Sequence, residues 1–591
     1  MAPISRSASR RQARAVVTAL VATVAALVLS ASCRSEPRAP SRDSPSGGKD
    51  AAPTRGGELV VSLRSEPTTY NRLVDQSTAG EDLALLTQAP LVYVNRATDT
   101  LEPWLAESWT ESADHLDYTV KLRPGVTFSD GTPLTSADVV FTFRALYDPK
   151  VESPLAGDTR VNGKPVQVTA IDPSTVIVRF PSPFAPGLRL IDGVRILPRH
   201  KLERALMEGK FPDAWSAKTP LTEIVGLGPF ILTEHVPGQR LLLTRNPRYW
   251  RKDAAGVALP YLDKLTVVVA SQAAEALKLQ SGEVDLMTNG DIRPEDYAAF
   301  KRSAGEGRVR LIDNGVGVDP NLLWFNLTSA KSADPKSRWF SNKAFRQAIS
   351  CAVDRQAIVN TVYLGEAVPI YGAMTPATRT WFADVRPACE HDPAKSRALL
   401  ASVGLTDRNG DGTLEDEAGT PVRFSILTQA DHIRARVVAV IQEQLRQAGI
   451  GIDVVPLDQG ALFKRYSEGN YDTIYFGIQA SSTDPALNPG FWLSSGDFHF
   501  WNPGQKTPAT EWERRVDDLM ARNATSPDPG ERVRLFTEVQ KILADEMPAI
   551  YFVTPKVTLA VSSRVRNPQP APQLPQLLWS ADTLAAAPQT R

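Results

Sequence analysis

Oxygen-bearing side chains recur at every second position in a short polar segment in the second half of the chain. The D-x-N-x-D-G spacing, which ends at Gly412, is that of the opening of an EF-hand calcium loop. The candidate ligands are Asp407, Asn409, Asp411 and, through its carbonyl group, Thr413. Ala418 holds the twelfth position, where a bidentate glutamate belongs, so the pattern predicts only a weak calcium site. The alternative is a polar turn that binds no metal.

A second candidate is the stretch 479–501, which has no helical or strand periodicity and combines acidic side chains with several aromatic rings. Long ordered loops are commonly functional. Exposed rings would pack against the side chains of a peptide, and an aspartate would pair with its α-ammonium group. The alternative for most of the rings is a small core that holds the loop. The candidate contacts are Asp484, Phe491, Trp492 and Trp501.

The usual signatures of catalysis and of nucleotide binding are missing from the sequence. The six histidines are scattered, and neither an H-E-x-x-H motif nor a G-x-S-x-G motif occurs. Gly226 and Gly228 lack the third glycine of a nucleotide loop and lead into a strand. Equal numbers of acidic and basic residues, 66 of each, give no bias toward nucleic acid. We therefore expect a protein that binds a ligand without transforming it.

Alternating strands and helices between residues 422 and 478 must position any such site. Strands are expected at 423–427, 450–454 and 473–478, with helices between them. The first helix carries an apolar stripe from Ile433 to Ala448 and stops at Gly449. Such alternation predicts a parallel sheet, and ligands bind beyond the carboxyl ends of its strands. The segment after Ile478 is therefore the expected place for ligand contacts.

The segment 103–146 predicts a strand, two turns and a helix. Residues 116–122 alternate apolar and polar side chains, and Thr135 with Asp138 forms the cap of the helix that follows. Its phrases LAESW, LRPGVTFSDGTPL and DVVF resemble, in this order, the signature region of the family 5 solute-binding proteins. These proteins are the extracytoplasmic receptors of peptide and nickel ABC importers.

Further motifs extend the resemblance over roughly residues 56–555. Leu227 replaces the family's usual threonine in one of them. They are ILPRH at 196–200, GLGPF at 226–230, RNPRYW at 245–250, YLDK at 261–264, SGEVDL at 281–286, FRQA at 345–348 and AVDR at 352–355.

The resemblance implies an α/β fold with two lobes, of the large type II periplasmic-binding-protein kind, with mixed sheets, a hinge and an extra third domain. Residues 549–553 are an apolar strand candidate that could rejoin the first lobe. The expected segments are a first lobe at 56–88 and 196–310, an extra strand-rich domain at 89–195, a second lobe at 311–548 and a return to the first lobe at 549–585.

The implied function is the capture of a peptide between the lobes and its delivery to an ABC permease that has separate ATPase subunits. The resemblance places an aspartate that holds the ligand amino terminus at Asp484. It also implies backbone pairing with the peptide at Ser77, Thr78, Ala79 and Gly80. A monomer without a cofactor is expected. The alternatives are a receptor for a nickel chelate, haem or an oligosaccharide, and a sensor or chaperone on the same scaffold.

The amino-terminal end has the plan of an export signal. A basic stretch precedes the apolar run 15–29 and the small residues before Cys33, which predicts a signal peptide over 1–32. Cys33 resembles the lipid-modified cysteine of a bacterial lipoprotein, although Leu29 lies one position too far away; ordinary cleavage near residue 32 is the alternative. The polar segment 33–55 would be a flexible tether. We expect a periplasmic or cell-surface protein anchored to the membrane.

Cys351 and Cys389 are the other two cysteines. Export permits a disulfide bond between them. Cys351 lies on the apolar face of an expected helix, and this position favours a buried free thiol.

Overall fold

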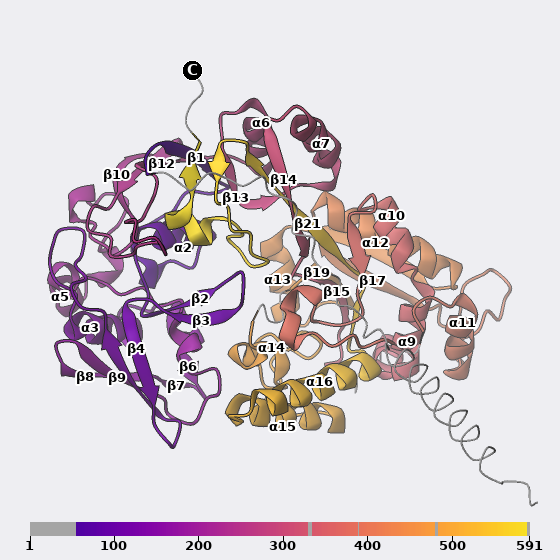
Figure 1. The fold of residues 1–591 in the computed structure, drawn as a ribbon. Coiled ribbons are helices and arrows are strands. Elements are labelled where there is room, and N and C mark those ends of the chain that lie inside the picture. The colour runs from indigo at the N-terminus through magenta and orange to yellow at the C-terminus, as the bar shows by residue number, and fades with distance from the viewer. Residues whose placement is uncertain (1–54, 329–333, 388, 479–482, 588–591) are drawn as a thin grey trace, which may run out of the picture. The chain divides into compact units, whose positions relative to one another are not determined.

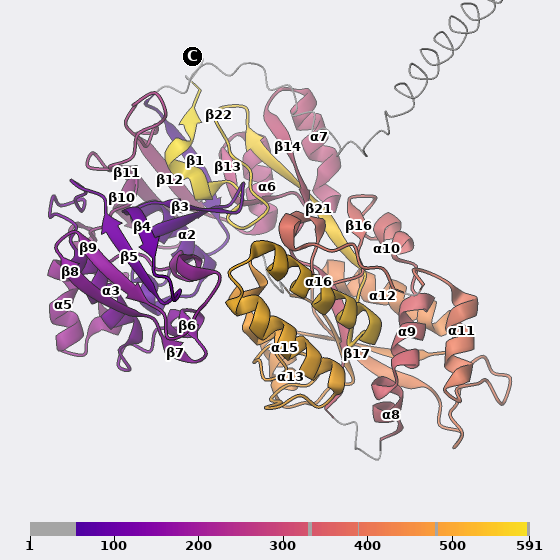
Figure 2. The same ribbon diagram turned by 60° about the horizontal axis from the view of Figure 1, so that its bottom comes forward.

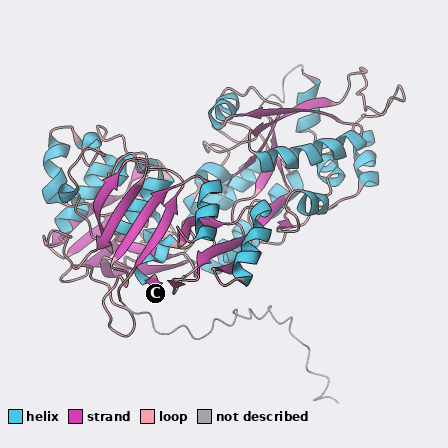
Figure 3. Ribbon diagram, turned by 90° about the horizontal axis from the view of Figure 1, so that it is seen from above, coloured by secondary structure: helices cyan, strands magenta, loops and turns pink. Residues whose placement is uncertain are grey.

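The structure, a computed structural model, describes residues 55–328, 334–387, 389–478 and 483–587. The predicted signal peptide, Cys33 and nearly all of the tether lie outside these residues. No helix in the described ranges is both long and apolar enough to cross a membrane. Helices and strands are mixed throughout, as the α/β prediction requires (Figure 3).

An eight-stranded mixed sheet forms the core of the first lobe. Its order is β10-β11-β12-β1-β13-β21-β14, and β16 pairs with β21. Strand β1 is parallel to both β12 and β13, whereas β21 is antiparallel to β13 and β14. The strands are β1 (Glu58–Leu63), β10 (Phe230–Val236), β11 (Arg240–Arg245), β12 (Lys264–Val269), β13 (Leu286–Asp291), β14 (Val309–Val316), β16 (Ala367–Pro369) and β21 (Val553–Ser562). The helices are α2 (Thr78–Thr87), α6 (Gln272–Ser281) and α7 (Tyr297–Gly305), and a short 3-10 helix, η8 (Leu578–Thr583), follows near the carboxyl end.

A strand-rich insertion follows α2. Its four-stranded antiparallel sheet has the order β4-β5-β9-β8. Helix α3 begins with the predicted cap, because the Asp138 carboxylate accepts the backbone N–H of Thr135 at 2.9 Å. The insertion shares one continuous hydrophobic core with the first lobe. Its elements are β2 (Val92–Asn95), β3 (Thr100–Pro103), β4 (Ala106–Glu111), β5 (Asp117–Leu122), α3 (Ser136–Tyr147), α4 (Leu155–Asp158), β6 (Arg160–Val161), β7 (Lys164–Pro165), β8 (Gln167–Asp172), β9 (Thr175–Arg179) and α5 (Arg199–Met207).

The second lobe contains a five-stranded sheet of order β18-β17-β19-β15-β20. Strand β17 is parallel to β18 and β19, as the alternating pattern predicts. The strands are β15 (Asn321–Phe325), β17 (Arg423–Gln429), β18 (Gly451–Leu457), β19 (Thr473–Gly477) and β20 (Ala549–Tyr551). The helices are α8 (Pro335–Ser341), α9 (Lys343–Ala352), α10 (Arg355–Thr361), α11 (Pro393–Ser402), α12 (His432–Gln447), α13 (Gln459–Ser467), α14 (Pro489–Trp492), α15 (Glu511–Thr525) and α16 (Pro529–Glu546).

Burial of one face explains why α12 forms where the apolar stripe predicts it. Val437, Ile441 and Leu445 are fully buried in the core of the second lobe. The Asp431 side chain caps the first turn, and Gly449 follows the last turn with φ +82°.

Two neighbouring segments of the chain cross between the two sheets, in addition to the connections before and after β16. The chain leaves β14 of the first sheet and enters β15 of the second through residues 317–320, and it returns between β20 and β21 at Phe552. The candidate strand 549–553 therefore ends the second sheet before β21 rejoins the first, beside β14 (Figures 1 and 2). The segment 317–320 and the segment after Phe552 lie next to each other. A hydrogen bond joins them, from the N–H of Gly317 to the carbonyl group of Pro555 at 2.9 Å. A small, two-stranded β22 (Val565–Arg566) and β23 (Ala585–Ala586) pair closes the fold.

Candidate functional site

A chamber of about 350 Å³ lies beside these crossings, and we call it the hinge chamber. Its walls come from the carboxyl ends of parallel strands in both sheets, where ligands of such sheets bind. Arg64 follows β1, Asn289 and Asp291 end β13, and Arg434 follows β17 in the first turn of α12. The crossing segments contribute Asp319 and Lys556. Both lobes therefore contribute residues to the hinge chamber, at the strand ends where a ligand is expected.

The first-lobe wall is held by an ion network. Arg64 donates to Glu275 at 2.7 Å and to Asp291 at 2.9 Å, and Glu275 is buried. Burial would lower the pKa of the Arg64 guanidinium, but the carboxylates of Asp291 and Glu275 outweigh it and raise that pKa. Arg64 is consequently a fixed part of the wall.

The second-lobe wall presents Arg434, which is held on three sides. Its Nε atom donates to Asn321 at 3.2 Å and its Nη1 atom to Gln429 at 2.8 Å. The guanidinium carbon lies 4.7 Å from the centre of the Phe476 ring. Gly477 makes room for this arrangement, because a Cβ atom there would come within 3.0 Å of Nη2. Arg434 is half-buried and rigidly placed at the chamber.

Several polar groups of the hinge chamber lack protein partners. The side-chain oxygens of Asn289 and Gln576 are buried and have no hydrogen-bond donor among the described residues. Burial raises the pKa of Tyr363 to about 12, so this side chain remains a neutral phenol. Burial also raises the pKa of Asp319, against the opposing effect of Arg434. The chamber therefore offers acceptors, a carboxyl group and one oriented guanidinium.

Residues 77–80 lie at the start of α2 instead of in an extended loop. Ser77 is the helix cap, and its hydroxyl accepts the N–H of Gly80 at 3.0 Å. The N–H of Glu81 donates to the Ser77 carbonyl group at 3.0 Å. Thr78, Ala79 and Gly80 form the first turn of α2, and their backbone pairing with a peptide stays a prediction.

Asp484 has a protein partner in the place expected for a ligand ammonium. Both carboxylate oxygens accept hydrogen bonds from Arg532, at 2.5 and 2.7 Å, and the residue is 6 % exposed. One oxygen also accepts the N–H of Ala486. This geometry gives Asp484 a structural role, and its direct contact with a ligand stays a prediction.

Most aromatic residues of the same loop form the small core that was predicted as the alternative. Phe491, Trp492 and Trp501 are each no more than 2 % exposed, and the Phe491 ring lies edge-on to both tryptophans. Trp492 also packs against Phe536 of α16. These rings hold the loop, and none of them lines the hinge chamber.

The predicted calcium loop brings three carboxylates together. Oxygen atoms of Asp407, Asp411 and Glu415 lie within 4.8 Å of one another. Glu415 holds the ninth position of the motif and was not among the ligands predicted from the sequence. Asn409 and Thr413 are bonded to Asp411, through the Asn409 amide at 3.1 Å and the Thr413 backbone N–H at 2.7 Å. The donor set suits a hard cation.

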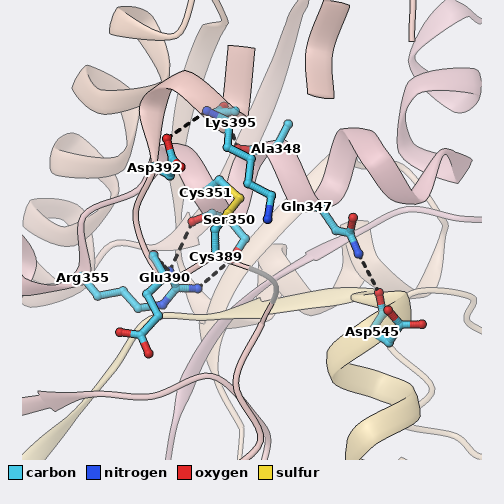
Figure 4. Close-up of a disulfide and its surroundings, with 11 residues drawn as sticks. Gln347, Ala348, Ser350, Cys351, Arg355, Cys389, Glu390, Asp392, Lys395 and Asp545 are labelled. Carbon is cyan, nitrogen blue, oxygen red and sulfur yellow. Dashed lines mark hydrogen bonds between the residues drawn. A yellow bond between two sulfur atoms is a disulfide. The ribbon is translucent and has the colours of Figure 1, made fainter. Parts of the chain in front are cut away.

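The two distant cysteines are joined, so the expectation of a free thiol is wrong. Cys351 at the end of α9 and Cys389 before α11 form a disulfide with a Cα–Cα distance of 5.6 Å (Figure 4). Packing of α9 against α11 brings them together, which sequence separation does not reveal. Beside the bond, the buried Arg355 donates to the carbonyl groups of Ser350 and Glu390 (Figure 4).

Comparison with known proteins agrees with this architecture. Residues 100–500 match the model of the bacterial extracellular solute-binding proteins, family 5. The chain belongs to this family. Its receptors serve ABC transporters outside the cytoplasm, and the two-lobed α/β fold expected from the sequence motifs is confirmed.

Individual relatives span most of the chain. A probable ABC transporter-binding protein of Deinococcus radiodurans is 28 % identical over 85 % of this chain and 87 % of its own. The oligopeptide-binding protein AppA of Bacillus subtilis is 28 % identical over 78 % and 80 %. The structure of NikA from Brucella suis with Fe(III)-EDTA superposes with a TM-score of 0.73 at 22 % identity, over 90 % of this chain and all of NikA.

Arg434 and Gln576 line the chamber but were not predicted from the sequence. Arg434 had a usable signal, because it follows a predicted parallel strand at the edge where ligands bind. The prediction of ligand contacts was limited to the segment that follows the strand ending at Ile478. Gln576 lies in an irregular segment far along the chain, and no local pattern connects it with the chamber.

Proposed function

We propose that this family 5 receptor binds peptides between its two lobes and delivers them to an ABC permease powered by separate ATPase subunits. The observation that carries the proposal is the hinge chamber, where strand ends of both sheets meet beside the crossings. The name of the relative AppA supports a peptide as the ligand class. Binding at such a place couples ligand contact to lobe closure without any chemical step.

Mass spectrometry of ligands that co-purify with the exported protein tests this proposal. We expect short peptides in the native sample and their absence after unfolding, dialysis and refolding. Calorimetry with the peptides found should then give binding at one site. Recovery of only non-peptide solutes would contradict the peptide assignment and leave the receptor role in place.

A small polar solute is the second candidate ligand. The hinge chamber is modest in volume and lined by hydrogen-bonding groups, and the relative NikA was solved with a metal chelate. The same mass spectra separate this candidate from peptides. A sensor or chaperone role would show as peptide binding without uptake in cells that carry the partner permease genes.

We also propose that the mature protein is a monomer held at the membrane by lipid on Cys33. A diacylglyceryl group supplies the two chains that firm anchoring requires. Cys33→Ala should move the protein from the membrane to the soluble fraction, with intact mass showing the loss of lipid. Equal solubility of the unchanged protein, with no lipid on its amino terminus, would contradict the anchor.

A further inference from the structure

A second pocket, of about 510 Å³, lies on the second lobe, and no described residue lines both it and the hinge chamber. Helices α8, α9 and α11 come together there (Figure 2). The end of α8, Asn342 between α8 and α9, the turn 403–405 after α11 and the segment 416–418 line it, and we call it the α8–α11 pocket. A pocket of this volume can hold a whole small molecule.

Asp416 brings a charged carboxylate into the wall of the α8–α11 pocket. The residue is 8 % exposed, and its Oδ1 atom accepts the backbone N–H groups of Ala418 and Thr420, both at 2.9 Å. Burial would raise the pKa of this carboxyl, but the two N–H donors outweigh it and lower that pKa. Asp416 is therefore an ionised carboxylate in a fixed orientation.

The other carboxylate oxygen of Asp416, Oδ2, is buried and has no hydrogen-bond donor among the described residues. Nη2 of Arg338 lies 3.9 Å from it, which is beyond hydrogen-bond distance, and the Arg338 side chain is 71 % exposed. Such an exposed, loose ion pair compensates little of the cost of burying a charged oxygen. A positively charged donor in the pocket would satisfy Oδ2.

The rest of the α8–α11 pocket suits a cation that carries an apolar stem. Glu417 adds an exposed carboxylate that forms no ion pair among the described residues, and Arg338 is the single basic side chain in the lining, so the pocket is negatively charged overall. Trp339 and Leu405 are 6 % and 2 % exposed and give the pocket apolar walls. An aliphatic stem packs on such walls while its charged end reaches a carboxylate.

We propose that the α8–α11 pocket binds the primary ammonium group of a small aliphatic amine on Asp416, with the stem against Trp339 and Leu405. Only one oxygen of Asp416 is free, which suits the point charge of an ammonium better than the two-pronged fork of a guanidinium. This site is separate from the hinge chamber, and the inference does not depend on the proposed receptor function.

Calorimetry with two probes of similar shape tests the proposal. The probes are 1,5-diaminopentane and 1,5-pentanediol, which has the same length and no charge. The diol should bind about 10- to 100-fold more weakly than the diamine, the range for a hydrogen bond between charged groups. Asp416→Asn keeps an oxygen for Ala418 and Thr420 and removes the charge, so it should weaken the diamine by a similar factor. Asp453→Asn is the matched control, because Asp453 is an exposed acid of the same lobe that does not line the pocket.

A second variant should change the affinity in the opposite direction. Arg338→Gln removes the positive charge that competes for Asp416, and its exposed position leaves the core of the lobe intact. It should tighten diamine binding about 2- to 5-fold, the range for an exposed charge pair. A carboxylate with only a structural role predicts no change in this variant. If Asp416→Asn does not fold, the affinity of Arg338→Gln decides alone.

Three results would overturn the inference. They are no binding of the diamine, equal affinity for the diamine and the diol, and a diamine affinity that is the same in the unchanged protein and in both pocket variants. None of them bears on peptide binding in the hinge chamber, which the co-purified ligands test separately.

Discussion

Arg532 holds both carboxylate oxygens of Asp484 in a buried ion pair, at 2.5 and 2.7 Å. Loss of one partner from such a pair leaves an uncompensated charge and costs about 3–5 kcal/mol. Asp484→Asn should therefore lower the free energy of unfolding by this order, measured by urea denaturation. Asp453→Asn breaks an exposed pair with Arg423 and should cost under about 1 kcal/mol.

Peptide binding by Asp484→Asn shows whether Asp484 only pairs with Arg532 or also contacts the ammonium group of a ligand. A structural role predicts that Asp484→Asn weakens a free and an amino-acetylated peptide equally. Selective loss of the free peptide would restore Asp484 as the partner of the ligand ammonium.

The disulfide between Cys351 and Cys389 should stabilise the second lobe. A bond that closes a loop of this size, between cysteines 38 positions apart in the sequence, contributes about 2–4 kcal/mol. The double variant Cys351→Ser with Cys389→Ser should lower the urea midpoint, and dithiothreitol should lower it only for the unchanged protein. Alkylation of both thiols in the native protein without reductant would contradict the bond.

Asp82 makes stability depend on pH. Its side chain is 2 % exposed, and burial together with the charge of Glu81 raises its pKa from 3.8 to about 8, against the effect of Arg96. The folded state then keeps a proton that the unfolded state loses, so this group reduces stability as the pH rises from about 4 to about 8. Asp82→Asn should flatten that dependence in urea midpoints measured at pH 5 and pH 8. Asp172→Asn, an exposed acid, should leave it unchanged.

The loop at 407–415 should respond to calcium. At a concentration ten times its dissociation constant, a cation that binds only the folded state adds about 1.4 kcal/mol. Calcium should raise the thermal midpoint, and Asp411→Asn should abolish the rise, whereas Asp453→Asn should not. A rise of equal size in both variants would show that the loop is only a polar turn.

Ligand binding should bring the two lobes together. The two adjacent crossings at 317–320 and Phe552 are the connections that a hinge needs. Small-angle scattering should show a smaller radius of gyration with a bound peptide. An unchanged curve with a tightly bound peptide would indicate a rigid pocket.

Much of the fold followed from local patterns, while the site depended on contacts between distant segments. Helix α12 could be predicted because its stripe, cap and terminal glycine are neighbours in sequence. Asp484 could not be assigned in this way, because its partner Arg532 is brought to it by the packing of a later helix. The same limit applied to Cys351 with Cys389 and to Arg434 with Gln576.

Strand β21 has a consequence for biosynthesis. It lies between β13 and β14, so β14 joins the first sheet only through a strand that begins at Val553. The amino-terminal lobe of a nascent chain therefore lacks an interior strand until residues 553–562 have been translated. A precursor with an unfinished sheet stays open to an export channel that accepts unfolded chains, and folding is completed only after the carboxyl end arrives.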